Sequence, residues 1–331
     1  MSNTMLVTPN EAARLIEAGR TLLLAGDEAL LSTLPKGAWI GGTSANFITA
    51  DGGATDQAHV LVTDLTDHVA SVDIRVYDEA SLPGLGGDYS DNGFSVIILP
   101  GLSSIHTAFA RGVQSYEGIF NSPLIGWIAG VHLSEVGARA PKSFAGDGLT
   151  RDGQAVVMHV TLPQGSSAHL DIINLFKQGA GADIEFDGEG FEVGEKCRIG
   201  GKTANLARYI VDHGIDTKLP LVADFNGAMI NVSIQSVDVE AGRVNLYAPV
   251  FKGVTYRFAE PVADYVGEFA RQVGEKAEQS TIFSCNCILN YAYADLEGKR
   301  TGDFVGPVTF GEIAYMLLNQ TLVYLAIDKL V

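Results

Sequence analysis

The sequence predicts an α+β protein of two mixed α/β halves whose mostly buried sheets pack together. Segments with helically spaced apolar residues alternate with short apolar runs along the whole chain. The 331 residues exceed what one hydrophobic core usually serves, and a hydrophobic content of 47% is sufficient for full cores. The polar stretch from Gln164 to Ser167 interrupts the pattern. We therefore place the halves at 1–163 and 164–331.

The first half begins with a helix and continues mainly with strands. Thr8-Pro9-Asn10-Glu11 is a capping box with proline at the first helical position, and the helix that it starts should stop at Gly19. A serine cap followed by apolar residues at helical spacing predicts a second helix within 103–116. Strands are expected at 59–65, 73–78, 95–100, 122–133 and 154–163.

The second half alternates between helix and strand. We expect a short helix at 169–179, a polar connection at 183–195, and a helix at 204–214 capped by Thr203. The segment 261–279 has a clear apolar stripe at helical spacing. Strands are expected at 243–250, 281–289 and 321–327.

Charge and composition exclude several classes of function. The net charge of −17 comes without a basic stripe, which argues against nucleic acid and anionic membranes as partners. No uninterrupted apolar run approaches the ~20 residues of a membrane helix, so no membrane insertion is expected. We detect no signal peptide, and three cysteines fit a reducing compartment. A cytoplasmic location follows as an expectation.

The motifs for catalysis and metal binding are incomplete. "GEKCRIGGKTAN" has Lys196 where a phosphate-binding loop needs its first glycine, and "PGLSSIH" has Ile105 where a nucleophile elbow needs its second. Cys285 and Cys287 share one face of a predicted strand but supply two ligands at most. We therefore expect no catalytic residue, no metal and no cofactor.

Two glycine-rich stretches have the same form. Each has an aliphatic residue, a glycine, four residues and then Gly or Asn, at 40–48 and at 305–313, with a partial copy at 125–130. Gly and Asn tolerate positive φ, so both stretches should be corners at strand ends with unpaired backbone N–H groups. Chance similarity between glycine-rich turns is the alternative.

The chain resembles the FIST family over nearly its whole length. The C-terminal motifs are "IFSCNCIL", "FVGPVTFGEI" and "LNQTLVYLAI", and "AWIGGTSANFI" resembles the corner of the N-terminal half. The residues that carry the C-terminal likeness are Ser284, Cys285, Gly306, Gly311, Glu312, Asn319, Gln320 and Thr321. The resemblance implies an intracellular sensory module for small, amino-acid-like ligands that is usually coupled to a signalling output, and one branch of the family is associated with haem. We expect this chain to act alone or through a separate signalling protein.

We expect a ligand site between the halves, where corner N–H groups hold a carboxylate and Glu312 holds an ammonium. The candidate ligand-binding residues are Gly41, Gly42, Thr43, Asn46, Trp127, Cys285, Thr309, Gly311 and Glu312. An alternative role for Glu312 is an acidic residue at a helix N-terminus. The alternative functions are a hydrolase or isomerase that uses Glu312 and Cys285, a haem-binding sensor, and a purely structural or partner-binding protein.

Overall fold

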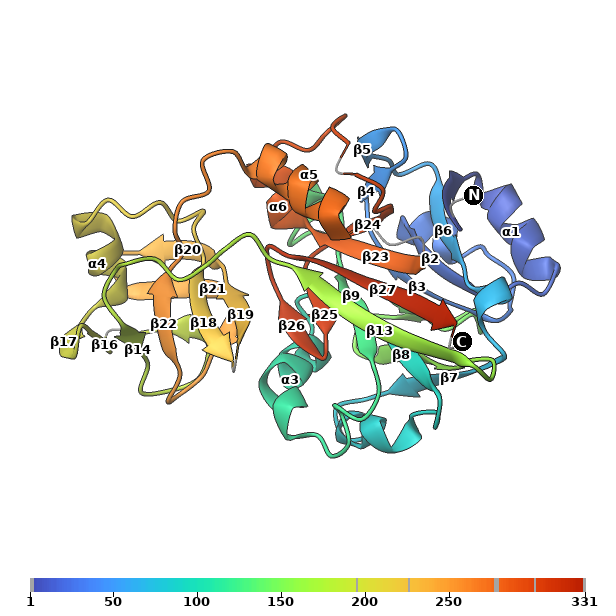
Figure 1. Ribbon diagram of the computed structural model, residues 1–331, viewed down its shortest axis with the longest axis horizontal. Coiled ribbons are helices and arrows are strands. Elements are labelled where there is room, and N and C mark those ends of the chain that lie inside the picture. Colours follow the sequence, from blue (N-terminus) through green and yellow to red (C-terminus); the bar gives the residue numbers. More distant parts are fainter. Residues whose placement is uncertain (1–2, 195, 226, 277–279, 301, 330–331) are drawn as a thin grey trace. The chain divides into compact units, whose positions relative to one another are not determined.

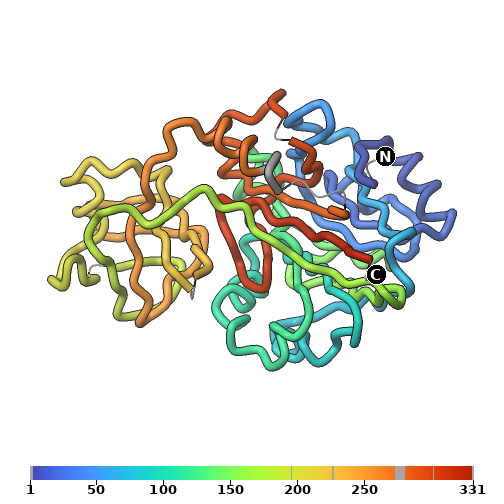
Figure 2. The backbone as a smooth tube through the Cα atoms, in the orientation of Figure 1, coloured from blue at the N-terminus to red at the C-terminus, as the bar shows by residue number. Residues whose placement is uncertain are grey.

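The computed structural model describes residues 3–194, 196–225, 227–276, 280–300 and 302–329, and confirms the α+β class. The chain forms two compact units (Figure 1). Unit 1 comprises 1–173, 269–317 and 321–331, and unit 2 comprises 174–268 and 318–320. In Figure 2 the tube leaves unit 1 in green and returns in orange.

The units differ from the expected halves because a strand, and not a helix, follows residue 164. The short helix expected at 169–179 is wrong: β13 (Ser166–Ile173) pairs along its whole length with β27 (Leu322–Lys329). This antiparallel pairing keeps 166–173 in unit 1. The chain departs only after Ile173.

Unit 1 contains three sheets of six strands each. The first has the order β1 (Thr4–Val7), β6 (Val60–Asp64), β2 (Leu22–Gly26), β3 (Trp39–Thr43), β10 (Ser143–Phe144), β11 (Thr150–Arg151). The second has the order β26 (Met316–Leu318), β25 (Glu312–Ala314), β9 (Leu124–Ala129), β8 (Gly93–Pro100), β12 (Ala155–Thr161), β7 (Ser71–Tyr77). The third has the order β13, β27, β23 (Thr281–Cys287), β24 (Gly306–Thr309), β4 (Asn46–Thr49), β5 (Gly52–Thr55).

Helices connect these strands. They are α1 (Pro9–Glu17), α2 (Glu28–Leu31), α3 (Ser104–Gly112) and α6 (Ile288–Tyr293), with 3-10 turns η1 (Thr66–His68), η2 (Leu82–Asp88), η3 (Val113–Ser115) and η4 (Leu133–Glu135). The capping box of α1 is confirmed, because Thr8 and Glu11 exchange hydrogen bonds. Ser103 caps α3 as expected, accepting from the N–H of His106. Helix α5 (Tyr265–Lys276) spans the unit boundary.

Sheets pack face to face at the middle of unit 1. A Cβ at Gly42 of β3 would lie 2.7 Å from Ile98 of β8 and 2.8 Å from the indole nitrogen of Trp127 in β9. Such distances are too short for a real Cβ, so glycine is required for this close approach. The face of β9 that carries Trp127 therefore meets β3, and it also meets β23, because the ring centroids of Trp127 and Phe283 are 5.6 Å apart. The candidate site lies in this layer.

In the described residues, unit 2 has one sheet of six short strands, one sheet of three strands, and a helix. One sheet has the order β17 (Lys202–Ala204), β16 (Cys197–Ile199), β14 (Ile184–Glu185), β22 (Thr255–Phe258), β18 (Leu221–Phe225), β19 (Ala228–Val232), and the other has β15 (Gly190–Val193), β21 (Arg243–Val250), β20 (Ile234–Asp238). Helix α4 (Leu206–Asp212) is capped by Asn205 and not by Thr203, which lies in β17. The connection expected at 183–195 contains β14 and β15.

Candidate functional site

The residues expected to bind a ligand all lie in unit 1, although they come from both expected halves. Strand β3 contains Gly41, Gly42 and Thr43, and β4 contains Asn46. Trp127 lies in β9, Cys285 lies in β23, and Thr309 lies in β24. Gly311 follows β24, and Glu312 lies in β25. Each of them is buried. The common location follows from strand pairing, because β25 lies beside β9, and β24 lies between β23 and β4.

Glu312 is the central acidic residue of this layer and is 0% exposed. It begins the strand β25, so the alternative of a helix N-terminal acid is wrong. Its Oε2 accepts a hydrogen bond from the Thr321 hydroxyl at 2.7 Å and a longer one from the Thr321 backbone N–H at 3.4 Å. Its Oε1 accepts no hydrogen bond from any residue that the structure describes. One carboxyl oxygen is therefore held in place and the other remains available.

Burial changes the acid strength of this group. Burial raises the pKa of the Glu312 carboxyl to about 8, even though the hydrogen bonds from Thr321 act in the opposite direction. Burial therefore favours the neutral form of this carboxyl near pH 7. A cation next to Oε1 would favour the ionised form and lower the pKa again.

Trp127 lies directly opposite Glu312 in the antiparallel pair of β25 and β9. Paired residues of this kind point to the same face of a sheet. The indole N–H of Trp127 is buried and donates to no acceptor in the described chain. Glu312 and Trp127 thus present one unpartnered acceptor and one unpartnered donor to the same layer.

The two cysteines of β23 face the same layer. The Cys285 thiol donates to the backbone carbonyl of Gly126 at 3.4 Å, and Cys287 lies two residues further along the same face of the strand. Burial, with a smaller effect of the Glu312 charge, raises the pKa of Cys285 well above its usual value. A thiol in this state is a poor nucleophile. Among described residues, no group of three His, Cys, Asp or Glu side chains could hold a metal ion.

Asn46 lies on the other face of the third sheet. Its register partners across the sheet are Val308 of β24 and then Asn286 of β23. Because side chains alternate along a strand, Asn286 points away from the face that carries Cys285 and Cys287. Asn46 is therefore separated from Glu312 by the sheet itself.

Several of the corner N–H groups that were expected to hold an anion are already bonded. The N–H of Thr43 donates to the carbonyl of Lys142, and that of Phe310 donates to the carbonyl of Ile128, each at 3.0 Å. Gly41 and Gly42 pair with β2 inside the sheet. The indole N–H of Trp127 is a buried side-chain donor without a partner among the described residues.

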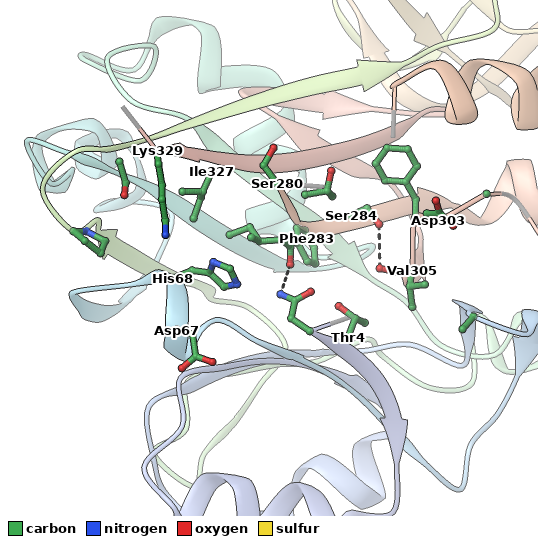
Figure 3. Close-up of a pocket in the computed structure, with 18 of the residues that line it drawn as sticks. Thr4, Asp67, His68, Ser280, Phe283, Ser284, Asp303, Val305, Ile327 and Lys329 are labelled. Atoms are coloured by element: carbon green, nitrogen blue, oxygen red, sulfur yellow. Dashed lines mark hydrogen bonds between the residues drawn. The ribbon is translucent and has the colours of Figure 1, made fainter. Parts of the chain in front are cut away.

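An open groove of about 1490 Å³ lies at the other end of β23. In Figure 3, Asp67, His68 and Lys329 lie on one side of it, and Ser284, Asp303 and Val305 on the other. Phe283 lines the groove, and its ring centroid is 5.6 Å from that of Trp127. The aromatic pair connects the groove to the Glu312 layer.

Sequence reasoning found Glu312 and Trp127 but missed three other buried polar residues, one that bonds Glu312 and two on the opposite face of β23. Thr321 was noted only as part of a motif, although its hydroxyl holds Glu312. Asn286 and Asn290 were not selected, and both are at most 2% exposed. The available signal was a polar residue next to an apolar run, since such residues need partners once buried.

The fold and these residues define an α+β protein with an acidic site buried between sheets. A family model described as a family of unknown function, DUF6976, matches residues 7–328, and the chain belongs to that family. A comparison with curated proteins found no match. In the described part of the chain, no helix has both the length and the apolar character needed to cross a membrane.

Proposed function

We propose that unit 1 binds a small amino-acid-like ligand at Glu312 and Trp127. The observation that carries the proposal is the pair of buried polar atoms without partners, Glu312 Oε1 and Trp127 Nε1, on directly opposed residues. Buried polar groups in folded proteins nearly always have partners, so two such atoms in one layer need an explanation.

The chemistry of the two atoms selects the ligand class. An ionised carboxyl oxygen accepts from an ammonium group, and an indole N–H donates to a carboxylate. A molecule that carries both groups satisfies both atoms, whereas a simple amine or a simple carboxylate satisfies one. The thiol of Cys285 does not favour the hydrolase or isomerase alternative, because its pKa is raised.

The groove beside Phe283 provides the route of entry in this proposal. Phe283 is 2% exposed and contacts Trp127, so its ring must move for a ligand to pass. The resemblance to the FIST family supports the same class of function. Under this proposal, the protein acts as a cytoplasmic sensor that passes the bound state to a separate signalling protein.

A thermal-shift screen tests the proposal. Free amino acids, simple amines and simple carboxylates are compared on the wild-type chain, on Glu312→Gln, and on Glu117→Gln, an exposed control in unit 1. A ligand at 100 times its Kd should stabilise the protein by about 2.7 kcal/mol. We expect an amino acid to stabilise the wild type and the control equally, and Glu312→Gln by at least about 1.4 kcal/mol less, which is a tenfold or greater loss of affinity. Equal shifts for Glu312→Gln and the wild type would contradict the proposal.

A further inference from the structure

A second pair of buried polar side chains lies on the face of β23 that points away from Glu312. Asn286, near the end of β23, is 2% exposed, and Asn290 of α6 is 1% exposed. Their side chains touch, since the Asn290 amide nitrogen donates to the Asn286 oxygen at 2.9 Å. The two amides therefore act as one group.

Backbone contacts fix the orientation of both amides. The N–H of Cys287 donates to Asn286 Oδ1 at 2.8 Å, so that atom must be the oxygen. Asn290 Nδ2 donates to the carbonyl of Thr321 at 3.1 Å, so that atom must be the nitrogen. An exchange of oxygen and nitrogen in either amide would place like groups against each other.

This orientation leaves one amide donor and one amide acceptor without hydrogen-bond partners among the described residues. Asn286 Nδ2 and Asn290 Oδ1 are buried, and neither has a hydrogen-bond partner among the residues described. A group that fits must accept from the first and donate to the second. A carboxylate has no donor, and an ammonium has no acceptor, so each satisfies one atom only.

The sheet register places Asn286 in one row with a residue at the surface. Four residues follow one another across β23, β24, β4 and β5 in the order Asn286, Val308, Asn46, Thr55. Asn46 Nδ2 donates to the Thr55 hydroxyl at 2.9 Å, and that hydroxyl donates to Glu297 at 2.8 Å. Thr55 and Glu297 are exposed. Since neighbouring strands are about 4.8 Å apart, Asn286 lies roughly 10 Å from Asn46 and is still further from the exposed rim.

We propose that Asn286 and Asn290 form a binding site for a carboxamide. The carbonyl oxygen of the ligand accepts from Asn286 Nδ2, and its N–H donates to Asn290 Oδ1. A neutral amide also suits a site whose two recognition groups are uncharged, because an ion placed there would lose hydration without a counter-charge. Thr321 bonds both Asn290 and Glu312, but the free atoms of the two pairs lie on opposite faces of the third sheet. Binding of a neutral amide to the asparagine pair can therefore be tested whether or not Glu312 binds an amino acid.

Acetamide is the probe that tests this site, with acetate as the matched anion. The full-length wild-type chain is labelled with 15N, and the side-chain amide signals are followed during each titration. We expect a saturable shift of the Asn286 and Asn290 signals with acetamide and none with acetate. Asn286→Asp keeps the acceptor for Cys287 and replaces only the free donor, so it should weaken the response at least tenfold.

A crystal soaked in acetamide gives a second measurement that needs no variant. Density for a planar group between Asn286 Nδ2 and Asn290 Oδ1 supports the site. A single water molecule at that position, together with no saturable response in the titration, would overturn it. Equal responses to acetamide and acetate would also overturn it, because the free donor and acceptor would then not select the ligand.

Discussion

Glu312 and Trp127 occupy directly opposed positions of β25 and β9, and each keeps one buried polar atom without a partner in the described chain. Two neighbouring groups do have partners: Thr321 donates to the other oxygen of Glu312, and the Cys285 thiol donates to a backbone carbonyl. The Glu312–Trp127 pair is distinct from the unpartnered amides of Asn286 and Asn290 on the opposite face of β23. The pair leaves one acceptor and one donor on one face of one sheet.

The raised pKa of Glu312 predicts a pH dependence of stability. Between the unfolded pKa of 4.5 and the folded pKa of about 8, the folded protein holds a proton that the unfolded chain releases. The stabilisation is complete below pH 4.5 and is lost as the pH rises toward 8. Glu312→Gln should therefore gain stability relative to wild type across this window, by up to about 1.4 kcal/mol per pH unit. Urea unfolding at several pH values measures the free energy of unfolding of both proteins. If the difference between Glu312→Gln and wild type does not change with pH, the prediction is wrong.

His159 predicts an opposite dependence at lower pH. Its Nδ1 is 2.8 Å from the Ser95 hydroxyl, and its Nε2 is 2.7 Å from the Tyr77 hydroxyl. Burial lowers the pKa of His159 to about 4 from 6.5, so stability is complete above pH 6.5 and is lost as the pH falls toward 4. His159→Gln should be less stable at pH 7 but lose less stability on acidification. An equal loss of stability in variant and wild type between pH 6.5 and 4 would show that His159 titrates normally.

The thiols should be inert in the folded protein. Burial raises the pKa of Cys197 to about 11 and that of Cys285 well above its usual value, and all three cysteines are buried. We expect an aromatic disulfide reagent at pH 8 to react only as fast as the chain unfolds, and to modify all cysteines rapidly in denaturant. Fast modification of Cys285 in the native state would revive the enzymatic alternative.

Phe283 should limit access from the groove to Trp127. In a Trp39→Phe background Trp127 is the remaining tryptophan, since the sequence contains two. Phe283→Ala should increase the quenching of its fluorescence by acrylamide, because the ring that contacts Trp127 is removed. Phe304→Ala removes another aromatic residue of the groove, one that contacts Tyr324 instead, and should leave quenching unchanged. Equal effects of the two variants would argue against Phe283 as the barrier.

The sequence predicted those parts of the fold that depend on residues close to one another in the chain. The capping box at Thr8 and the buried strand before Cys287 are of this kind. The strand 166–173 was mistaken for a helix because it is an edge strand, half-buried along most of its length, without clear alternation. The pairing of Glu312 with Trp127 joins distant segments, and no local pattern encodes such a contact.

The most direct test of the central claim is calorimetry of amino-acid binding at pH 7 in two buffers with different ionisation enthalpies. If the ligand ammonium ionises Glu312, binding releases close to one proton, and the observed heat differs between the buffers accordingly. Glu312→Gln should lose this difference and weaken binding by about 1.5–3 kcal/mol, the scale of a hydrogen bond to a charged group. Binding with no proton release, and with equal affinity in Glu312→Gln, would contradict the account.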